Sequence, residues 1–215
     1  MQKRHVWPDG HWNWPIKVSH KQGVVAGDMI WISGQVDLTP DGVVRHQGDI
    51  ATQAANAMAN FASVLGHCDA SLTDLVKLLC FYVNDGTRTE RDVLEMVGKA
   101  LSDAHEPDAS GPAVTMVPVP YLAYPGMEIE IEGYAMRPGL ERHRIAPGAN
   151  SPLPPGFSEA IRCGKMIFVS GQTPVDDAGN LVGPDDAIAQ THQSMKQIGS
   201  RLAAFGADFA DVVKS

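Results

Sequence analysis

The sequence lacks the cysteine patterns that mark metal sites and disulfide-stapled domains. Its 215 residues include three cysteines, Cys68, Cys80 and Cys163, and no pair of them has the spacing of metal ligands. An odd number of scattered cysteines is typical of small buried thiols rather than of a disulfide framework. We therefore predict unpaired thiols, no metal site and a reducing, cytoplasmic environment.

Basic residues and long apolar runs are also scarce. Against 25 Asp and Glu there are 17 Lys and Arg, which gives a net charge of -8, and the longest basic run is Lys3-Arg4. Because nucleic acid is bound by basic surfaces, we expect no nucleic-acid partner. No stretch approaches the roughly 18 apolar residues that span a bilayer. The N-terminal MQKRHVWPDGHWNWPIK also lacks the apolar region of a signal peptide, so we expect no membrane association.

The sequence does contain an internal repeat. The segment MIWISGQ at 29–35 returns as MIFVSGQ at 166–172, an offset of 137 in residue number. A period this long indicates a duplicated domain rather than a solenoid of small units. The same offset relates Gly27 to Gly164, Gln53 to Gln190, Asp74 to Asp211, Val76 to Val213 and Lys77 to Lys214.

The first copy shows strand and helix patterns through to its end. The apolar spacing from residue 50 to 65 predicts a helix that Asp49 or Thr52 caps, and MEIEIEGYA places Glu128, Glu130 and Glu132 on one face of a strand. The order is ββαβαββ, which predicts an α+β domain whose mixed sheet has two helices on one face. The predicted strands span 24–33, 36–44, 75–83, 113–119 and 127–135, and the predicted helices span 50–65 and 90–104.

The second copy repeats only the first part of this pattern. We predict a complete domain over 1–137, a linker over 138–147 and the N-terminal half of a second domain over 148–215, with a helix over 187–205. The last residues, 211–214, match the start of a central strand in the first copy. We expect a chain cut short rather than a half-domain completed by a partner, because a bare sheet edge and helix face are avoided in soluble proteins.

These motifs, in this order, resemble the Rid family of reactive intermediate deaminases, also called YjgF-like or L-PSP. The resemblance rests on the glycine turn, the strand ending in SGQ, a glutamine in the first helix, a DxVK segment and an alternating glutamate strand. In this sequence they are Gly27, Ser33-Gly34-Gln35, Gln53, Asp74-Leu75-Val76-Lys77 and Ile129-Glu130-Ile131-Glu132-Gly133.

The resemblance implies a chorismate-mutase-like fold and a homotrimer, or a pseudo-trimeric assembly of tandem copies, with ligand sites in the clefts between copies. It also implies hydrolysis of small imines or enamines to ammonia and a carbonyl product, without metal or organic cofactor. A non-catalytic role in ligand binding or oligomer assembly is the alternative, and an endoribonuclease is a more distant one.

Such hydrolysis needs a cation for a substrate carboxylate, a group that positions water, and an apolar wall. The resemblance assigns the water-positioning role to Glu130 and places Ser33 and Gly34 at the ligand. The carboxylate-binding Arg of the family is matched by Val114, beside Thr115, so the first copy lacks its usual cation.

Other positions are matched by resemblance alone. His20 takes the place of an aromatic residue that borders the site, Glu95 that of a polar residue in the second helix, and the second-copy counterparts are Phe157, Ser170 and Gly171. Each has a purely structural alternative: a solvated sheet face for Glu130, an interface histidine for His20, and a strand-end turn for the SGQ motifs.

Overall fold

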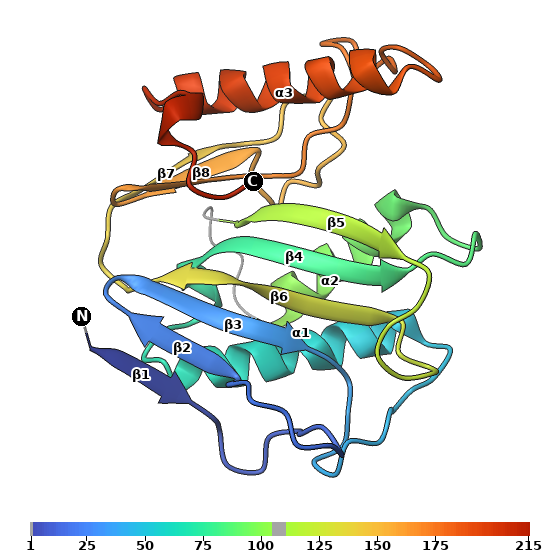
Figure 1. The fold of residues 1–215 in the computed structure, drawn as a ribbon, viewed down its shortest axis with the longest axis vertical. Coiled ribbons are helices and arrows are strands. Elements are labelled where there is room, and N and C mark those ends of the chain that lie inside the picture. The colour runs from blue at the N-terminus through green and yellow to red at the C-terminus, as the bar shows by residue number, and fades with distance from the viewer. Residues whose placement is uncertain (1, 105–110) are drawn as a thin grey trace.

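The computed structural model describes residues 2–104 and 111–215, and it is built on a six-stranded mixed sheet (Figure 1). The sheet order is β1-β2-β3-β6-β4-β5, and the neighbours are antiparallel except for the parallel pair β4–β5. The strands are β1 (Lys3–Val6), β2 (Gly23–Ala26), β3 (Met29–Gln35), β4 (Leu75–Val83), β5 (Ala113–Val119) and β6 (Ile129–Met136).

Helices α1 (Ile50–Gly66) and α2 (Glu90–Ala104) cover one face of this sheet (Figure 1). The carboxylate of Asp49 accepts a hydrogen bond from Thr52 N and so caps α1. The apolar side of α1 is buried against the sheet, where Phe61 and Ile131 belong to one core cluster. The predicted α+β class, with two helices on one face, is confirmed.

Three predicted local features were wrong. The strand expected over 24–33 is a hairpin of β2 and β3, because Gly27 turns the chain with a φ of 60°. The strand expected over 36–44 is reduced to one bridge between Leu38 and Val44, because Gly42 N donates to Thr39 O and closes a turn in its middle. Strand β1 was missed, since its first three residues are all exposed and carry no alternation.

The second copy forms a separate three-stranded sheet, in the order β7-β8-β9. Its elements are β7 (Arg142–Ile145), β8 (Ala160–Cys163), β9 (Met166–Val169) and α3 (Ala187–Ala203). Short 3₁₀ turns at Leu72–Asp74 and Phe209–Asp211 also repeat at the offset of the SGQ motifs. Figure 1 shows α3 on the side of this small sheet that faces away from the first copy.

Strand β7 lies inside the segment predicted as a linker and is the counterpart of β1. Lys3 pairs with Ala26 in the first copy as Arg142 pairs with Cys163 in the second. The first strands are therefore related by an offset of 139 in residue number, whereas the hairpins that follow keep the offset of 137. The second copy is two residues shorter between these strands.

The second copy is docked on β5 and α2 of the first. Phe157 is completely buried in the first copy's core cluster, and its ring lies against α2, since a Cβ atom on Gly98 would be 3.2 Å from Phe157 Cε2. Ser158 N donates to Pro112 O at 3.0 Å, and Ser158 forms a parallel bridge with Ala113. An aromatic anchor and a short stretch of backbone pairing are therefore among the contacts that join the copies, together with a second buried apolar cluster that contains residues of both.

The three cysteines are buried and unpaired, as predicted. In the part of the chain that the structure describes, no helix is long and apolar enough to cross a membrane.

Replacing the anchor with alanine is expected to destabilise the whole chain. Phe157→Ala leaves a cavity between the copies and should lower the free energy of unfolding by roughly 3–5 kcal/mol, measured by urea denaturation. The matched control is Phe209→Ala, which removes a phenylalanine that is 48% exposed and should lose on the order of 1 kcal/mol or less. Equal losses in the two variants would show that Phe157 does not anchor the copies.

Candidate functional site

The two SGQ corners are built by the same hydrogen bonds. Ser33 Oγ donates to Lys21 O at 2.8 Å, and Ser33 N donates to Gln22 O at 3.1 Å. In the second copy Ser170 makes the matching bonds to residues 158 and 159, at 2.6 Å and 2.9 Å. In both copies the serine hydroxyl therefore ties the end of a strand to the segment before the hairpin. This is the structural role that the sequence left open beside ligand contact.

In the first copy the Glu130 carboxylate lies directly over Gly34. The register between β3 and β6 shifts between Ile32 and Gln35, which places Gly34 in a bulge. A Cβ atom on Gly34 would be 1.7 Å from Glu130 Oε1, so any larger residue at position 34 would require this carboxylate to move. The structure thus places Glu130 against Gly34, next to Ser33 in the chain.

Glu130 is electrostatically distinct from an ordinary surface glutamate. Burial raises the pKa of its carboxyl group, and the neighbouring Glu132 carboxylate raises it further. A carboxylate with a raised pKa is a better proton acceptor than an exposed one. The position is suited to hold and polarise a water molecule.

Arg88 is a cation that the sequence did not identify, and it pairs with the first of the alternating glutamates at 128, 130 and 132. Arg88 follows β4, and its Nη1 lies 3.3 Å from Glu128 Oε2, with both side chains mostly buried. Glu128 immediately precedes β6 and alternates with Glu130 along the chain, so the two side chains share one face. Only the fold brings Arg88 to this row, because it is distant from Glu128 in sequence and no motif marks it.

His20 lies beside this corner, but its ring packs against the rings of Trp7 and Trp12. Its ring centroid is 5.0 Å from that of Trp7, and among the described residues no partner hydrogen-bonds either ring nitrogen. Burial lowers the pKa of the imidazole and outweighs the opposing effect of the Val18 backbone. Burial thus disfavours the charged imidazolium, and the ring of His20 packs against the ring of Trp7.

The second-copy corner is docked on the first copy at the predicted Arg position. Ser170 Oγ accepts a hydrogen bond from Val114 N at 2.8 Å, and Gly171 N donates to Val114 O at 2.9 Å. A Cβ atom on Gly171 would be 3.3 Å from the Thr115 side chain. The structure therefore brings Val114, Thr115, Phe157, Ser170 and Gly171 together between the copies.

This junction is closed. The side chains of Val114 and Phe157 are 1% and 0% exposed and share one apolar cluster. The corner thus forms packed core, with no opening at these two side chains through which a ligand enters.

Lys77 adds a buried cation to the same junction. Its Nζ donates to Thr115 Oγ1 and to Val169 O, each at 2.6 Å, and burial lowers its pKa to about 8. The sequence identified Lys77 within the DxVK segment. Its contact with the second copy joins residues 92 positions apart, so the motif alone did not reveal it.

Glu95 stands apart from both corners. It lies on the exposed face of α2 and pairs with Arg91 at 3.0 Å, an exposed contact that contributes little to stability. Among the described residues no contact joins Glu95 to Ser33 or Ser170. The predicted site residues thus separate into an open first-copy group, a closed group between copies and one surface residue.

The comparisons with known proteins agree on one family. The sequence profile of the family described as Endoribonuclease L-PSP matches residues 15–137 and again 149–215. A RutC family protein of Sinorhizobium fredii is 37% identical over 70 residues, which are 33% of this chain and 52% of that protein. A 2-iminobutanoate/2-iminopropanoate deaminase of Mus musculus is 33% identical over 70 residues, 33% of this chain and 49% of that protein. These matches span about half the length of the curated relatives.

Solved structures show the same fold. A Thermotoga maritima protein provisionally described as an endoribonuclease is 30% identical, with a TM-score of 0.52 over 65% of this chain and 100% of that one. A Rid family protein of Yersinia pestis is 22% identical, with a TM-score of 0.52 over 63% of this chain and 100% of that one. The second similarity bears on the fold alone.

The close approach of Gly34 to Glu130 generates a sharp test. In Gly34→Ala the new methyl group displaces the carboxylate toward solvent, so the pKa of Glu130 should fall toward its ordinary value of 4.5, measured by carbon NMR of the carboxyl group. Gly171→Ala is the matched control, because its methyl group meets only Thr115 and should leave that pKa unchanged. An unchanged pKa in Gly34→Ala would contradict the geometry.

Proposed function

This chain belongs to the Endoribonuclease L-PSP family, the Rid family of the resemblance above, and from this premise we propose that it hydrolyses small imines or enamines with release of ammonia. The observation that carries the proposal is the Glu130 carboxylate, held over Gly34 and beside Ser33 with a raised pKa. Family relatives named as imine deaminases support the reaction class.

The chemistry asks little of the protein beyond positioning. Glu130 accepts a proton from a water molecule, whose oxygen forms a bond to the carbon of the C=N group. Glu130 returns that proton to the nitrogen, which gives an amino alcohol. Glu130 then carries the hydroxyl proton to the nitrogen as the C=O bond forms and the C–N bond breaks, so ammonia leaves, a carbonyl product remains and the carboxylate is restored. The apolar surroundings of His20 and Trp7 supply a wall that excludes bulk water.

We also propose that the first-copy corner is completed by another copy. In the second corner β5 of the first copy docks on Ser170 and Gly171. No described residue donates to Ser33 Oγ in this way. Because β5 of each chain is already paired with its own second copy, the edge that completes the Ser33 corner must be a different one. The family resemblance favours a homo-oligomer of trimeric or pseudo-trimeric form, working in the cytoplasm.

The substrate preference is expected to be changed or the activity reduced, because Val114 offers no cation to a substrate carboxylate. Arg88, the cation in the Glu130 row, is partly neutralised by Glu128. We therefore expect the chain to discriminate weakly between imines with and without a carboxylate.

A non-catalytic scaffold role is the second candidate, and the closed junction favours it. Val114 and Phe157 are buried where the resemblance places a ligand cleft, so that corner holds the copies together rather than a substrate. A ribonuclease is less favoured, given a net charge of -8.

Ammonia release tests the two candidates. With imines generated by an amino-acid oxidase, Glu130→Gln should slow the protein-dependent rate by about 100-fold or more, and the control Glu95→Gln, at an exposed position on α2, should stay close to the unmodified rate. The acid limb of the rate should lie above pH 4.5, because the base works only when ionised and its pKa is raised. Equal rates with and without protein would exclude the hydrolase and leave the scaffold.

A further inference from the structure

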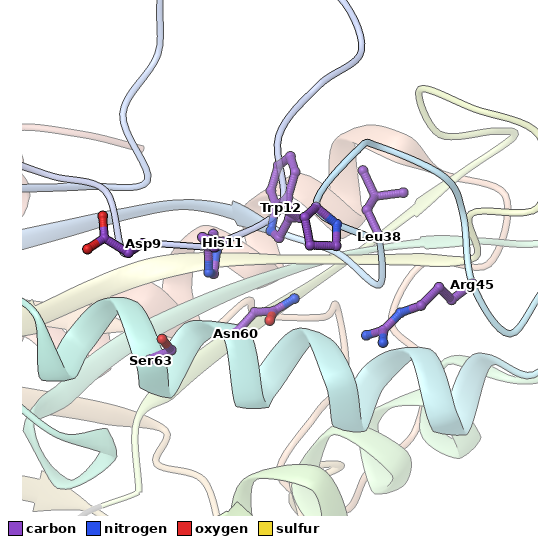
Figure 2. Close-up of a pocket in the computed structure, with 9 residues that line it drawn as sticks. Asp9, His11, Trp12, Leu38, Arg45, Asn60 and Ser63 are labelled. Carbon is purple, nitrogen blue, oxygen red and sulfur yellow. The ribbon is translucent and has the colours of Figure 1, made fainter.

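A cavity lies at the same place in both copies, on the helix side of each SGQ corner. In the first copy it measures about 290 Å³, and Figure 2 shows its lining from the N-terminal segment, the loop after β3 and α1. The second-copy cavity measures about 380 Å³ and lies between residues 145–153, the loop after β9 and α3. It includes Gly171 but none of Val114, Thr115, Phe157 or Ser170, so it is separate from the closed junction.

In the first copy an indole ring occupies this region. Trp12 is 3% exposed, and its Nε1 donates to Gln35 Oε1 at 3.2 Å (Figure 2 shows the ring). Gln35 Nε2 donates to Gln22 Oε1 and Ser33 O, which fixes the amide so that Oε1 faces the ring. Trp12 thus fills the space and also satisfies a buried acceptor.

The second copy has no ring to put there. On the offset of 139 that relates β1 to β7 and Pro8 to Pro147, Trp12 is matched by Ser151. The whole segment 145–156 contains no aromatic residue, so a shift of register does not restore one. This loss of a side chain accounts for the larger volume.

The second-copy cavity keeps the glutamine of the SGQ motif, but the side-chain oxygen of this glutamine lacks a hydrogen-bond donor among the described residues. Gln172 Nε2 donates to Ser170 O at 3.0 Å, as its counterpart does in the first copy, which again leaves Oε1 as an acceptor. Among the described residues no hydrogen bond reaches this oxygen. The amide is therefore oriented for a donor that the described part of the chain does not supply.

A charged pair has been added at the same point. Glu159 replaces Gln22 and Arg201 replaces Val64 on the offset of 137. Arg201 Nη2 contacts Glu159 Oε2 at 3.5 Å and Gln197 Oε1 at 3.4 Å, both at the long limit of a hydrogen bond, and among the described residues Arg201 Nε is buried without a partner. A buried guanidinium nitrogen without an acceptor is uncommon in folded proteins, so Arg201 Nε is a donor that an acceptor from outside the described residues could satisfy.

We propose that this second-copy cavity binds a small planar heteroaromatic molecule that carries an N–H donor and a ring acceptor. The ligand's ring occupies the volume that Trp12 fills in the first copy. The ligand's N–H donates a hydrogen bond to Gln172 Oε1, and its ring acceptor accepts a hydrogen bond from Arg201 Nε. The cavity volume suits a ligand of this size. The site is independent of imine hydrolysis at Glu130.

Benzimidazole is the probe, because it is planar, indole-sized and carries one N–H and one ring acceptor. Titration calorimetry of the full chain at pH 8 should show one site, and 1-methylbenzimidazole, which lacks the donor, should bind at least 10-fold more weakly. Ser151→Trp should abolish binding by filling the space without lowering the melting temperature. Arg201→Met should weaken binding several-fold.

The outcomes separate cleanly. Absence of binding up to the solubility limit, equal binding of the two probes, or unchanged binding by a folded Ser151→Trp variant overturns the proposal. If Ser151→Trp does not fold, judged by circular dichroism, the methylated probe and Arg201→Met decide: unchanged binding in either overturns the site, and loss in both supports it.

Discussion

The hydrogen bonds between Val114 on β5 and the Ser170–Gly171 corner hold the two copies together, beside an apolar cluster shared by both copies. An edge strand has backbone groups that need partners, and β5 finds them in the second copy. Phe157 adds apolar area beneath these bonds, and Lys77 adds one hydrogen bond across the junction, to Val169 O, while it also holds Thr115 within the first copy. Backbone pairing, an aromatic anchor and a buried cation thus act at one point.

This contact also makes position 114 unsuited to a charged side chain. The Val114 side chain belongs to a cluster that includes Phe157, and neither is exposed by more than 1%. A guanidinium in this place would be buried without a carboxylate or a phenolic oxygen to receive it, which is strongly unfavourable. Val114 and Phe157 therefore contribute to one packed apolar core between the copies. The open corner at Ser33, Gly34 and Glu130 is free of this constraint.

The sequence predicted elements whose pattern is internal and missed those that depend on distant residues. The ranges of α2, β4 and β5 matched their predictions, since continuous apolar runs and helical spacing are local signals. Strands β1 and β7 are short, and they exist because each pairs with a hairpin that lies further along the chain. In the site, Gly34 and Glu130 were found through their motif, whereas Arg88 and the burial of Val114 follow only from the tertiary arrangement.

The two copies show how one backbone carries different interiors. The serine-to-carbonyl bond of each corner is repeated, so the hairpin and the segment before it keep their relation in both. Behind that corner the side chains are free to change, provided that volume and hydrogen bonds are balanced. In the first copy the Trp12 ring fills the volume, and its N–H donates a hydrogen bond to Gln35. In the second copy Ser151, Glu159 and Arg201 leave volume and polar groups unfilled, and a ligand from outside the chain is the simplest group that restores the balance.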